Sequence, residues 1–235
     1  HMALARRTKI ALYAALAAVA ATGGIVYALT PEDQKIGSLL RFVLFHGAST
    51  WVNLLSFTAL AIISIATLFG WWKNSPGWAN TLRYMALIHW LINTALGILS
   101  SKLAWNQVNW QETRLRLSMW LLLAGLAVLL VHLILERPRL TAALDVVFAT
   151  VMWSGLSKIL LAEAGNLRPD RVHPDSPVFQ SGEMSIRFAF FAQAGVVIAA
   201  TVIIAFLVHD LMKAAHKKGA PGDGDSLSAL PAEGA

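Results

Sequence analysis

The chain has 235 residues, of which 57% are hydrophobic and 14% are charged, and its formal net charge is +6. Soluble domains contain about 25% charged residues, so this composition is typical of a membrane protein. The lack of cysteine excludes disulfides, Cys-ligated zinc, iron–sulfur clusters and thioether-bound heme within the chain. The sequence contains no nucleotide-binding loop, no Ser/His/Asp set and no HExxH motif. We therefore expect neither an enzyme nor a nucleic-acid-binding protein.

Six apolar stretches of about 20 residues or more predict transmembrane helices. They lie at 10–29, 42–70, 82–101, 117–135, 142–161 and 186–212. We expect an all-α, polytopic membrane protein with one six-helix domain over residues 10–212 in the lipid bilayer. Residues 1–9 are interpreted as a tag remnant, His1-Met2, followed by a short N-terminus. Residues 213–235 end in a Gly-, Pro- and Ser-rich stretch and are interpreted as a disordered tail.

Positive charges around the helices predict their orientation. Basic residues in segments 6–9 and 213–218 flank the first and last helices, which indicates that both termini are cytoplasmic. Lys73 and Arg83 are expected in one short cytoplasmic loop, and two arginines of segment 137–139 in another. The outer side carries almost as many cations as the inner side. That balance fits either an anionic partner at the outer face or cations that meet lipid headgroups and nearby carboxylates.

The second predicted helix opens with Arg41, His46 and Trp51 at five-residue intervals. On the same helix His46, Ser49, Asn53 and Ser56 fall at i, i+3, i+7 and i+10, which predicts one polar stripe that faces the bundle. Interhelical hydrogen bonds account well for the three residues after His46. An imidazole at the mouth of a membrane helix is better explained by a metal or metalloporphyrin, because neutral imidazole is the commonest metal ligand.

Two further outer loops carry candidate ligand-binding residues. In the segment from Lys102 to Arg114, Trp105 and Trp110 form either an interfacial aromatic belt or an apolar platform for a planar ligand whose carboxylates meet the two cations. The next outer loop contains His173, which is either a solvated loop residue or a ligand. Two histidines on one face, beside a Trp-rich segment, favour paired axial ligation of heme iron.

These residues resemble the tryptophan-rich (WWD) heme-handling family of bacterial cytochrome c maturation, and most closely its compact six-helix type. The matching pieces occur in order: Pro31-Glu32-Asp33 with Gly37; Arg41, His46 and Trp51; Gly97, Lys102 and Trp105; Glu112-Thr113-Arg114-Leu115; and His173 to Ser176. The family's Trp-rich core is altered, because only Trp105 keeps its place, Trp110 is displaced and Glu112 stands where the family has Asp.

The resemblance implies a protein of the bacterial inner membrane that holds heme b transiently at its outer, periplasmic face. It would pass the heme to a periplasmic heme chaperone, with transporter subunits of a cytochrome c maturation complex as further partners. The expected roles follow the matched positions: axial ligation for His46 and His173, porphyrin contact for Trp51, Trp105 and Trp110, and propionate binding for Arg41, Lys102 and Arg114. Glu112 is expected to be a loop carboxylate and not an iron ligand.

Three inner histidines leave other functions open. His89, His132 and His209 permit a membrane b-type cytochrome, in which two histidines hold heme inside the bundle and electrons cross the membrane. A third alternative is a structural subunit without a cofactor, in which every histidine is a packing residue. In that alternative His132 makes a local contact with Glu136, and the His209-Asp210 pair faces lipid headgroups.

The fifth predicted helix contains two ionisable residues inside a membrane span. Asp145 lies near its inner end, where we expect it to reach toward Arg137 or Arg139. Lys158 lies near its outer end and could join the cations there. The two residues are about 20 Å apart along a helix, so they cannot pair with each other.

Overall fold

The computed structural model describes residues 4–34, 36–164 and 183–219, without the side chains of Trp105, 160–164 and 216–219. Within these residues there are six helices: α1 (Arg6–Leu29), α2 (Leu39–Phe69), α3 (Ser75–Trp105), α4 (Thr113–Leu135), α5 (Pro138–Ala164) and α7 (Met184–Gly219). All six are long and apolar enough to cross a membrane. The predicted all-α fold with six such helices is therefore confirmed.

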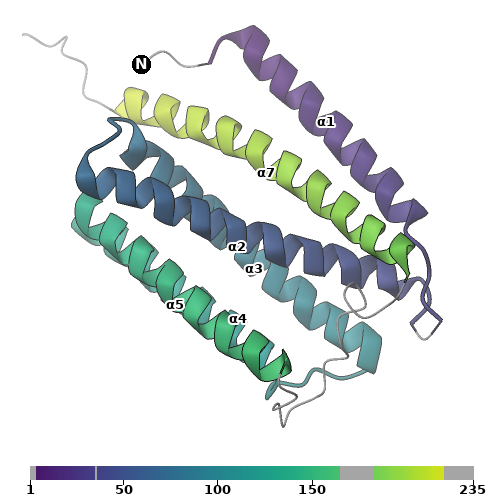
Figure 1. Cartoon of the computed structure of the whole chain (residues 1–235). Helices are drawn as coiled ribbons and strands as arrows, with labels where there is room; N and C mark the ends of the chain where they lie inside the picture. The colour runs from purple at the N-terminus through teal and green to yellow at the C-terminus, as the bar shows by residue number, and fades with distance from the viewer. Residues whose placement is uncertain (1–3, 35, 165–182, 220–235) are drawn as a thin grey trace, which may run out of the picture.

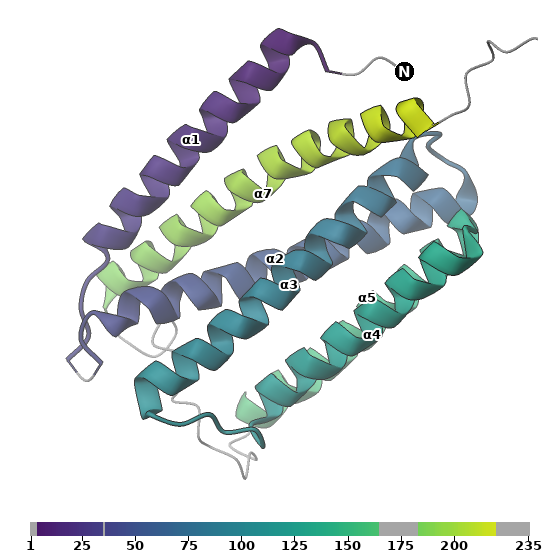
Figure 2. The ribbon, with the colours of Figure 1, turned by 180° about the vertical axis from the view of Figure 1, so that it is seen from behind.

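The helices form an elongated bundle with α2 and α3 in the middle (Figures 1 and 2). Helices α4 and α5 pack on one side of this central pair, and α7 packs on the other. Helix α1 lies outside α7 and has no buried residue of its own. Large apolar side chains cover the outside of the bundle, which is the surface expected of a protein whose solvent is lipid.

The core lies where α2, α3, α4 and α5 meet. Phe57 packs against both Trp90 and Phe148, and Met152 is fully buried beside them. The indole N–H of Trp90 donates to the carbonyl of Ser118 at 3.0 Å, so this buried aromatic residue keeps a hydrogen-bond partner. A smaller apolar cluster joins the first half of α2 to the start of α7; its members are Leu40, Leu44, Ala48, Ile186, Ala189 and Phe190.

The bundle has two ends, which we name after the residues that distinguish them. At the His46 end α1 passes to α2, α3 passes to α4, α5 ends and α7 begins. At the Arg83 end α1 begins and α7 ends, and two short loops connect α2 to α3 and α4 to α5. Lys9 forms an ion pair with Asp210 at 2.7 Å, which fastens the start of α1 to the last part of α7. Both ends of the six-helix domain therefore lie at the Arg83 end.

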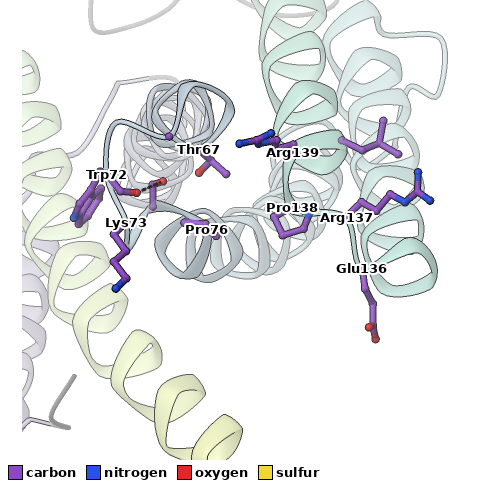
Figure 3. Close-up of a pocket in the computed structure, with 11 residues that line it drawn as sticks. Thr67, Trp72, Lys73, Pro76, Glu136, Arg137, Pro138 and Arg139 are labelled. Carbon is purple, nitrogen blue, oxygen red and sulfur yellow. Dashed lines mark hydrogen bonds between the residues drawn. The ribbon is translucent and has the colours of Figure 1, made fainter.

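The two loops at the Arg83 end are short because local sequence stops each helix sharply. Gly70 adopts φ +68° after α2, a left-handed conformation that glycine accepts without strain. Prolines lie in the first turn of the next helices, Pro76 in α3 and Pro138 in α5, where a missing N–H costs little. Between these loops lies an open cavity of about 580 Å³ (Figure 3).

Two predicted boundaries are wrong by seven residues each. Helix α7 continues to Gly219 and not only to 212, so the first part of the predicted tail is helical. Helix α3 begins at Ser75 and not at 82, and this difference changes the place of a charge. Arg83 therefore lies two turns inside α3 and not in the loop with Lys73. The prediction failed because an arginine was treated as the limit of an apolar stretch, whereas here its charge has a buried partner on another helix.

Candidate functional site

His46 lies on α2, seven residues after the helix begins, and faces α3 at Gly97. A methyl group added at Gly97 would lie 3.0 Å from Cε1 and 3.2 Å from Nε2 of the imidazole. The ring therefore occupies the space that any side chain at this position of α3 would need. The predicted stripe is confirmed in its direction, since Ser49 and Asn53 on the same face of α2 are buried.

After His46 along α2, a series of neutral polar contacts joins α2 to α3. Ser49 Oγ lies 2.8 Å from Nε2 of His89, and the amide of Asn93 donates to Thr50 Oγ1 at 2.8 Å. We name these contacts, together with those of Asn53, the polar seam. Its residues hold the two helices in register next to the His46 ring, because each interhelical bond fixes one pair of facing positions.

Asn53 makes an unusual contact in the polar seam. With its amide oriented to satisfy both groups, it donates to the carbonyl of Ala86 at 3.2 Å and accepts from the N–H of Trp90 at 2.8 Å. In an uninterrupted α-helix those two backbone groups bond to each other. The side chain of Asn53 is therefore inserted between these two backbone groups of α3, and its hydrogen bonds connect α2 to the backbone of α3.

The three predicted anion-binding cations all lie at the His46 end. Arg41 donates to the carbonyl of Thr30 at 3.0 Å and lies 3.4 Å from an exposed carboxylate oxygen of Glu32. Lys102 is exposed and donates to the carbonyl of Asn106 at 2.9 Å. Arg114 is half-buried in the first turn of α4. Exposed pairs of this kind are weak, so these cations can exchange their partners for a ligand carboxylate.

The predicted tryptophans lie differently with respect to His46. Trp110 is 56% exposed between α3 and α4, at the His46 end. Trp51 is 37% exposed, and its position five residues after His46 corresponds to about 140° around the axis of α2. Trp51 thus lies on another face of α2 from the imidazole. Trp105 is the last residue of α3, so its backbone lies at the His46 end.

His173 and Glu112 are the two remaining residues of the predicted outer loops. His173 lies outside the described residues, between the end of α5 and the start of α7. Glu112 lies in the loop directly before α4, as predicted, and its carboxylate also caps that helix. Its carboxylate accepts from the N–H of Leu115 at 2.6 Å and is 7% exposed. The signal that identifies it is an acidic residue directly before a helix, where side-chain oxygens satisfy free N–H groups.

The inner histidines occupy separate environments. His89 contacts Ser49 in the polar seam, and Nδ1 of His132 lies 3.5 Å from Thr141 Oγ1 across the α4–α5 loop. His209 stacks on Trp78 with ring centroids 3.9 Å apart and lies 2.9 Å from Thr81 Oγ1.

One prediction about these histidines is confirmed and one is wrong. The expected local contact of His132 with Glu136 is present, because the N–H of Glu136 donates to the carbonyl of His132. The headgroup-facing pair is wrong, because His209 and Asp210 are both buried and Asp210 is paired with Lys9. Helix α7 continues beyond this pair to Gly219, so the pair does not lie at the end of the helix.

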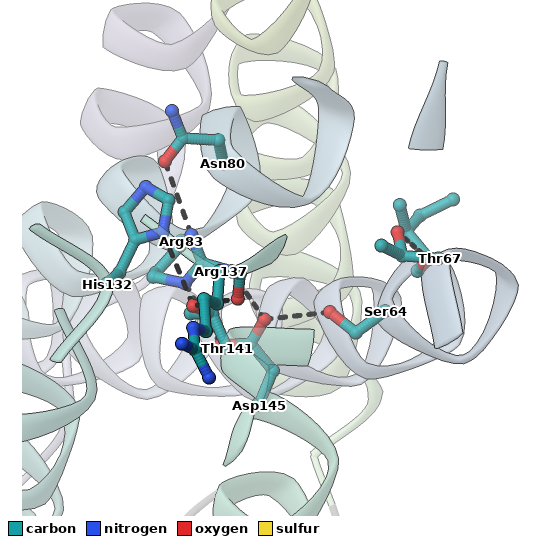
Figure 4. A network of polar contacts seen from close by, with 9 residues as sticks. Ser64, Thr67, Asn80, Arg83, His132, Arg137, Thr141 and Asp145 are labelled. Carbon is teal, nitrogen blue, oxygen red and sulfur yellow. Dashed lines mark hydrogen bonds and ion pairs between the residues drawn. The ribbon is translucent and has the colours of Figure 1, made fainter. Parts of the chain in front are cut away.

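At the opposite end, a buried ion pair lies between α3 and α5 (Figure 4). Arg83 donates twice to Asp145, from Nε at 3.0 Å and from Nη2 at 2.7 Å, and Ser64 adds a hydrogen bond at 2.8 Å. We name these three residues the Arg83 cluster. The expectation that Asp145 reaches toward Arg137 or Arg139 is therefore wrong. The signal available in the sequence was an arginine and an aspartate at matching depths, because charged groups inside a membrane pair with each other.

The residues of the His46 end fit a heme ligand in two respects. The imidazole is seated against Gly97 and is held at a defined place, as an axial ligand must be. Cations for two carboxylates lie at the same end of the bundle.

Comparison with known proteins adds no relative to this description. No family matches the chain, and no curated protein is detectably similar to it. Any function of this chain therefore has to be inferred from the residues themselves and from the motifs they form.

Proposed function

We propose that this protein binds heme at the His46 end of its bundle and presents it to a heme chaperone. The observation that carries the proposal is the seat of His46, an imidazole inside a membrane helix that packs on a glycine of the neighbouring helix. Histidine in such a place is costly unless it serves a ligand or a partner. The motif resemblance assigns axial ligation to the same residue.

Each group of residues would have a distinct task. His46 would ligate iron, with His173 as the second axial ligand. Arg41, Lys102 and Arg114 would meet the propionates, since guanidinium and ammonium groups bind carboxylates through charge-assisted hydrogen bonds. Bound heme would supply the iron chemistry, while the chain would bind and orient it. The exposed indole of Trp110 offers a flat apolar surface.

The location of the cations suits transient binding. Lys102 is exposed, and the contacts of Arg41 with described residues are a 3.4 Å pair with the exposed Glu32 and a hydrogen bond to a backbone carbonyl. A ligand held by such groups at the edge of the bundle can leave without unfolding it. We place the His46 end on the periplasmic side of a bacterial inner membrane, because basic residues flank α1 and α7 at the Arg83 end.

The test is a visible absorption spectrum of the detergent-purified protein after addition of hemin, oxidised and then reduced. The wild type is compared with His46→Ala, His173→Ala and the double variant. We expect a Soret band in the wild type that is reduced in each single variant and lost in the double variant. His132→Ala is the matched control, because it removes a histidine from the other end of the bundle, and it should keep the band.

Other outcomes identify other functions. A Soret band of full size in the double variant, lost instead on substitution of His89, His132 or His209, would replace the proposal with a membrane b-type cytochrome. The absence of any band from the folded wild type with hemin would favour a structural subunit without a cofactor. Circular dichroism of each variant must first establish that its helices are intact.

A further inference from the structure

The cavity between the two short loops at the Arg83 end is surrounded by positive charge. Its lining includes Lys73 from the α2–α3 loop, and Arg137 and Arg139 from the start of α5 and the residue before it, with Glu136 as its one acidic member (Figure 3). Arg139 extends toward Thr67 across the cavity, whereas the guanidinium of Arg137 and the carboxylate of Glu136 point away from it. The lining therefore carries three cations against one carboxylate, and Arg139 is the cation that reaches across the space.

The cations that line this cavity are exposed, and their pairing differs from that of other charges of the bundle. Within residues 4–34, 36–164 and 183–219, ion pairs join Lys9 to Asp210, Arg41 to Glu32 and Arg83 to Asp145, and none includes a cation of the cavity. Helices α3 and α5 begin at the cavity and α2 and α4 end there, so the opposite ends of the helix dipoles offset each other. The attraction of the cavity for anions therefore comes from its cationic side chains.

The surroundings of the cavity indicate an anion that belongs to a lipid. Trp72 lines it and is 40% exposed, and Trp71 beside it is 73% exposed and stacks on Phe69. Tryptophan at the end of an apolar bundle marks the interface between hydrocarbon and water. Leu140 and Phe69 continue this exposed apolar surface along α5 and α2. A ligand seated here would have its charge in the cavity and its apolar part along the helices.

We propose that this cavity binds the phosphate of an anionic phospholipid headgroup. Basic pockets between membrane helices bind such headgroups because the cations offset the phosphate charge at a level where water is scarce. Arg139 would contact the phosphate, Arg137 would reach it by turning its exposed side chain toward the cavity, and Lys73 would contribute charge from the opposite loop. The acyl chains would lie against the exposed apolar side chains. This site is independent of heme and lies at the other end of the bundle.

The experiment measures retention of phosphatidylglycerol by the purified protein against phosphatidylcholine, by native mass spectrometry in a mild detergent. The variant Arg137→Gln/Arg139→Gln is compared with Arg6→Gln/Arg7→Gln. The second variant removes the same charge from exposed arginines at the same end of the bundle but outside the cavity. Each cation near an anionic lipid contributes a factor of about five. We expect phosphatidylglycerol binding to weaken by about 25-fold in the first variant and by less than about twofold in the second.

Equal loss in both variants would overturn the site, because it would show a general response to charge. Unchanged binding in Arg137→Gln/Arg139→Gln would overturn it as well. Inorganic phosphate is the second probe and distinguishes the source of the anion. Displacement of phosphatidylglycerol by phosphate at millimolar concentration would overturn the lipid assignment, whereas retention of the lipid under those conditions supports it. The heme spectrum should be the same in both variants.

Discussion

The polar seam and the Arg83 cluster join the same helix, α3, to its neighbours, but they meet the cost of buried polar groups in different ways. The Arg83 cluster uses full charges that neutralise each other, and its carboxylate accepts three hydrogen bonds. The polar seam uses neutral groups, whose hydrogen bonds are about as long as those of the Arg83 cluster. It leaves the side-chain oxygen of Asn93 without a hydrogen-bond partner. A region in which every buried polar group has a hydrogen-bond partner has a structural role. A region with an unpaired polar group can accept a further hydrogen bond from a ligand.

The largest expected effect comes from removal of one charge of the Arg83 cluster. Asp145→Leu leaves the buried guanidinium of Arg83 without its partner, and such a loss costs about 3–5 kcal/mol. The free energy of unfolding in detergent micelles, measured by circular dichroism against denaturant, should fall by that amount. The double variant Arg83→Leu/Asp145→Leu should recover most of the loss, because apolar residues of similar volume replace a buried ion pair at little cost. A double variant as unstable as the single one would contradict this account.

The next effect concerns the seat of His46. In Gly97→Ala the new methyl group lies 3.0 Å from the imidazole, so the ring must shift, and overpacking of this kind costs about 2 kcal/mol. If His46 is an axial ligand, heme affinity should fall by about tenfold, which a hemin titration followed at the Soret band would measure. Gly195→Ala is the matched control, because nothing lies within 4 Å of its added methyl group. Equal affinity in Gly97→Ala and the wild type would separate His46 from heme binding.

The sequence predicted the helices far better than the contacts between them. Hydropathy located all six, since each must present about 20 apolar residues to lipid. The stripe of Ser49 and Asn53 was predictable because helical periodicity places those residues on one face. The partner of Arg83 was not predicted, because Asp145 lies 62 positions away and only the packing of α3 beside α5 brings the two together. A search for ionisable residues at matching depths in different spans would have suggested the pair.

The candidate site shows the same limit. Spacing identified His46 as unusual, but the glycine that seats it lies on another helix, and nothing in the spacing reveals which residue of α3 faces the ring. Trp51 was grouped with His46 because the two are near in sequence, although five residues turn a helix by about 140°. Residues that come together through helix packing therefore have to be read from the structure, whereas helix ends such as the cap at Glu112 can be read from local sequence.

The smallest effect sharpens the comparison between the two regions with one type of substitution. Ser64→Ala removes a hydroxyl that donates to a charged carboxylate, and Ser49→Ala removes one that contacts a neutral imidazole. Hydrogen bonds to charged groups contribute about 1.5 kcal/mol or more, while neutral bonds between membrane helices average about 0.6 kcal/mol. Ser64→Ala should therefore lower the free energy of unfolding by about 1 kcal/mol more than Ser49→Ala. Both serines are buried on α2, so the change in volume and helix propensity is the same. Equal losses would mean that the charge of Asp145 does not strengthen its hydrogen bond with Ser64. The difference between a region with a structural role and one that can accept a ligand would then depend on the packing of His46 against Gly97 alone.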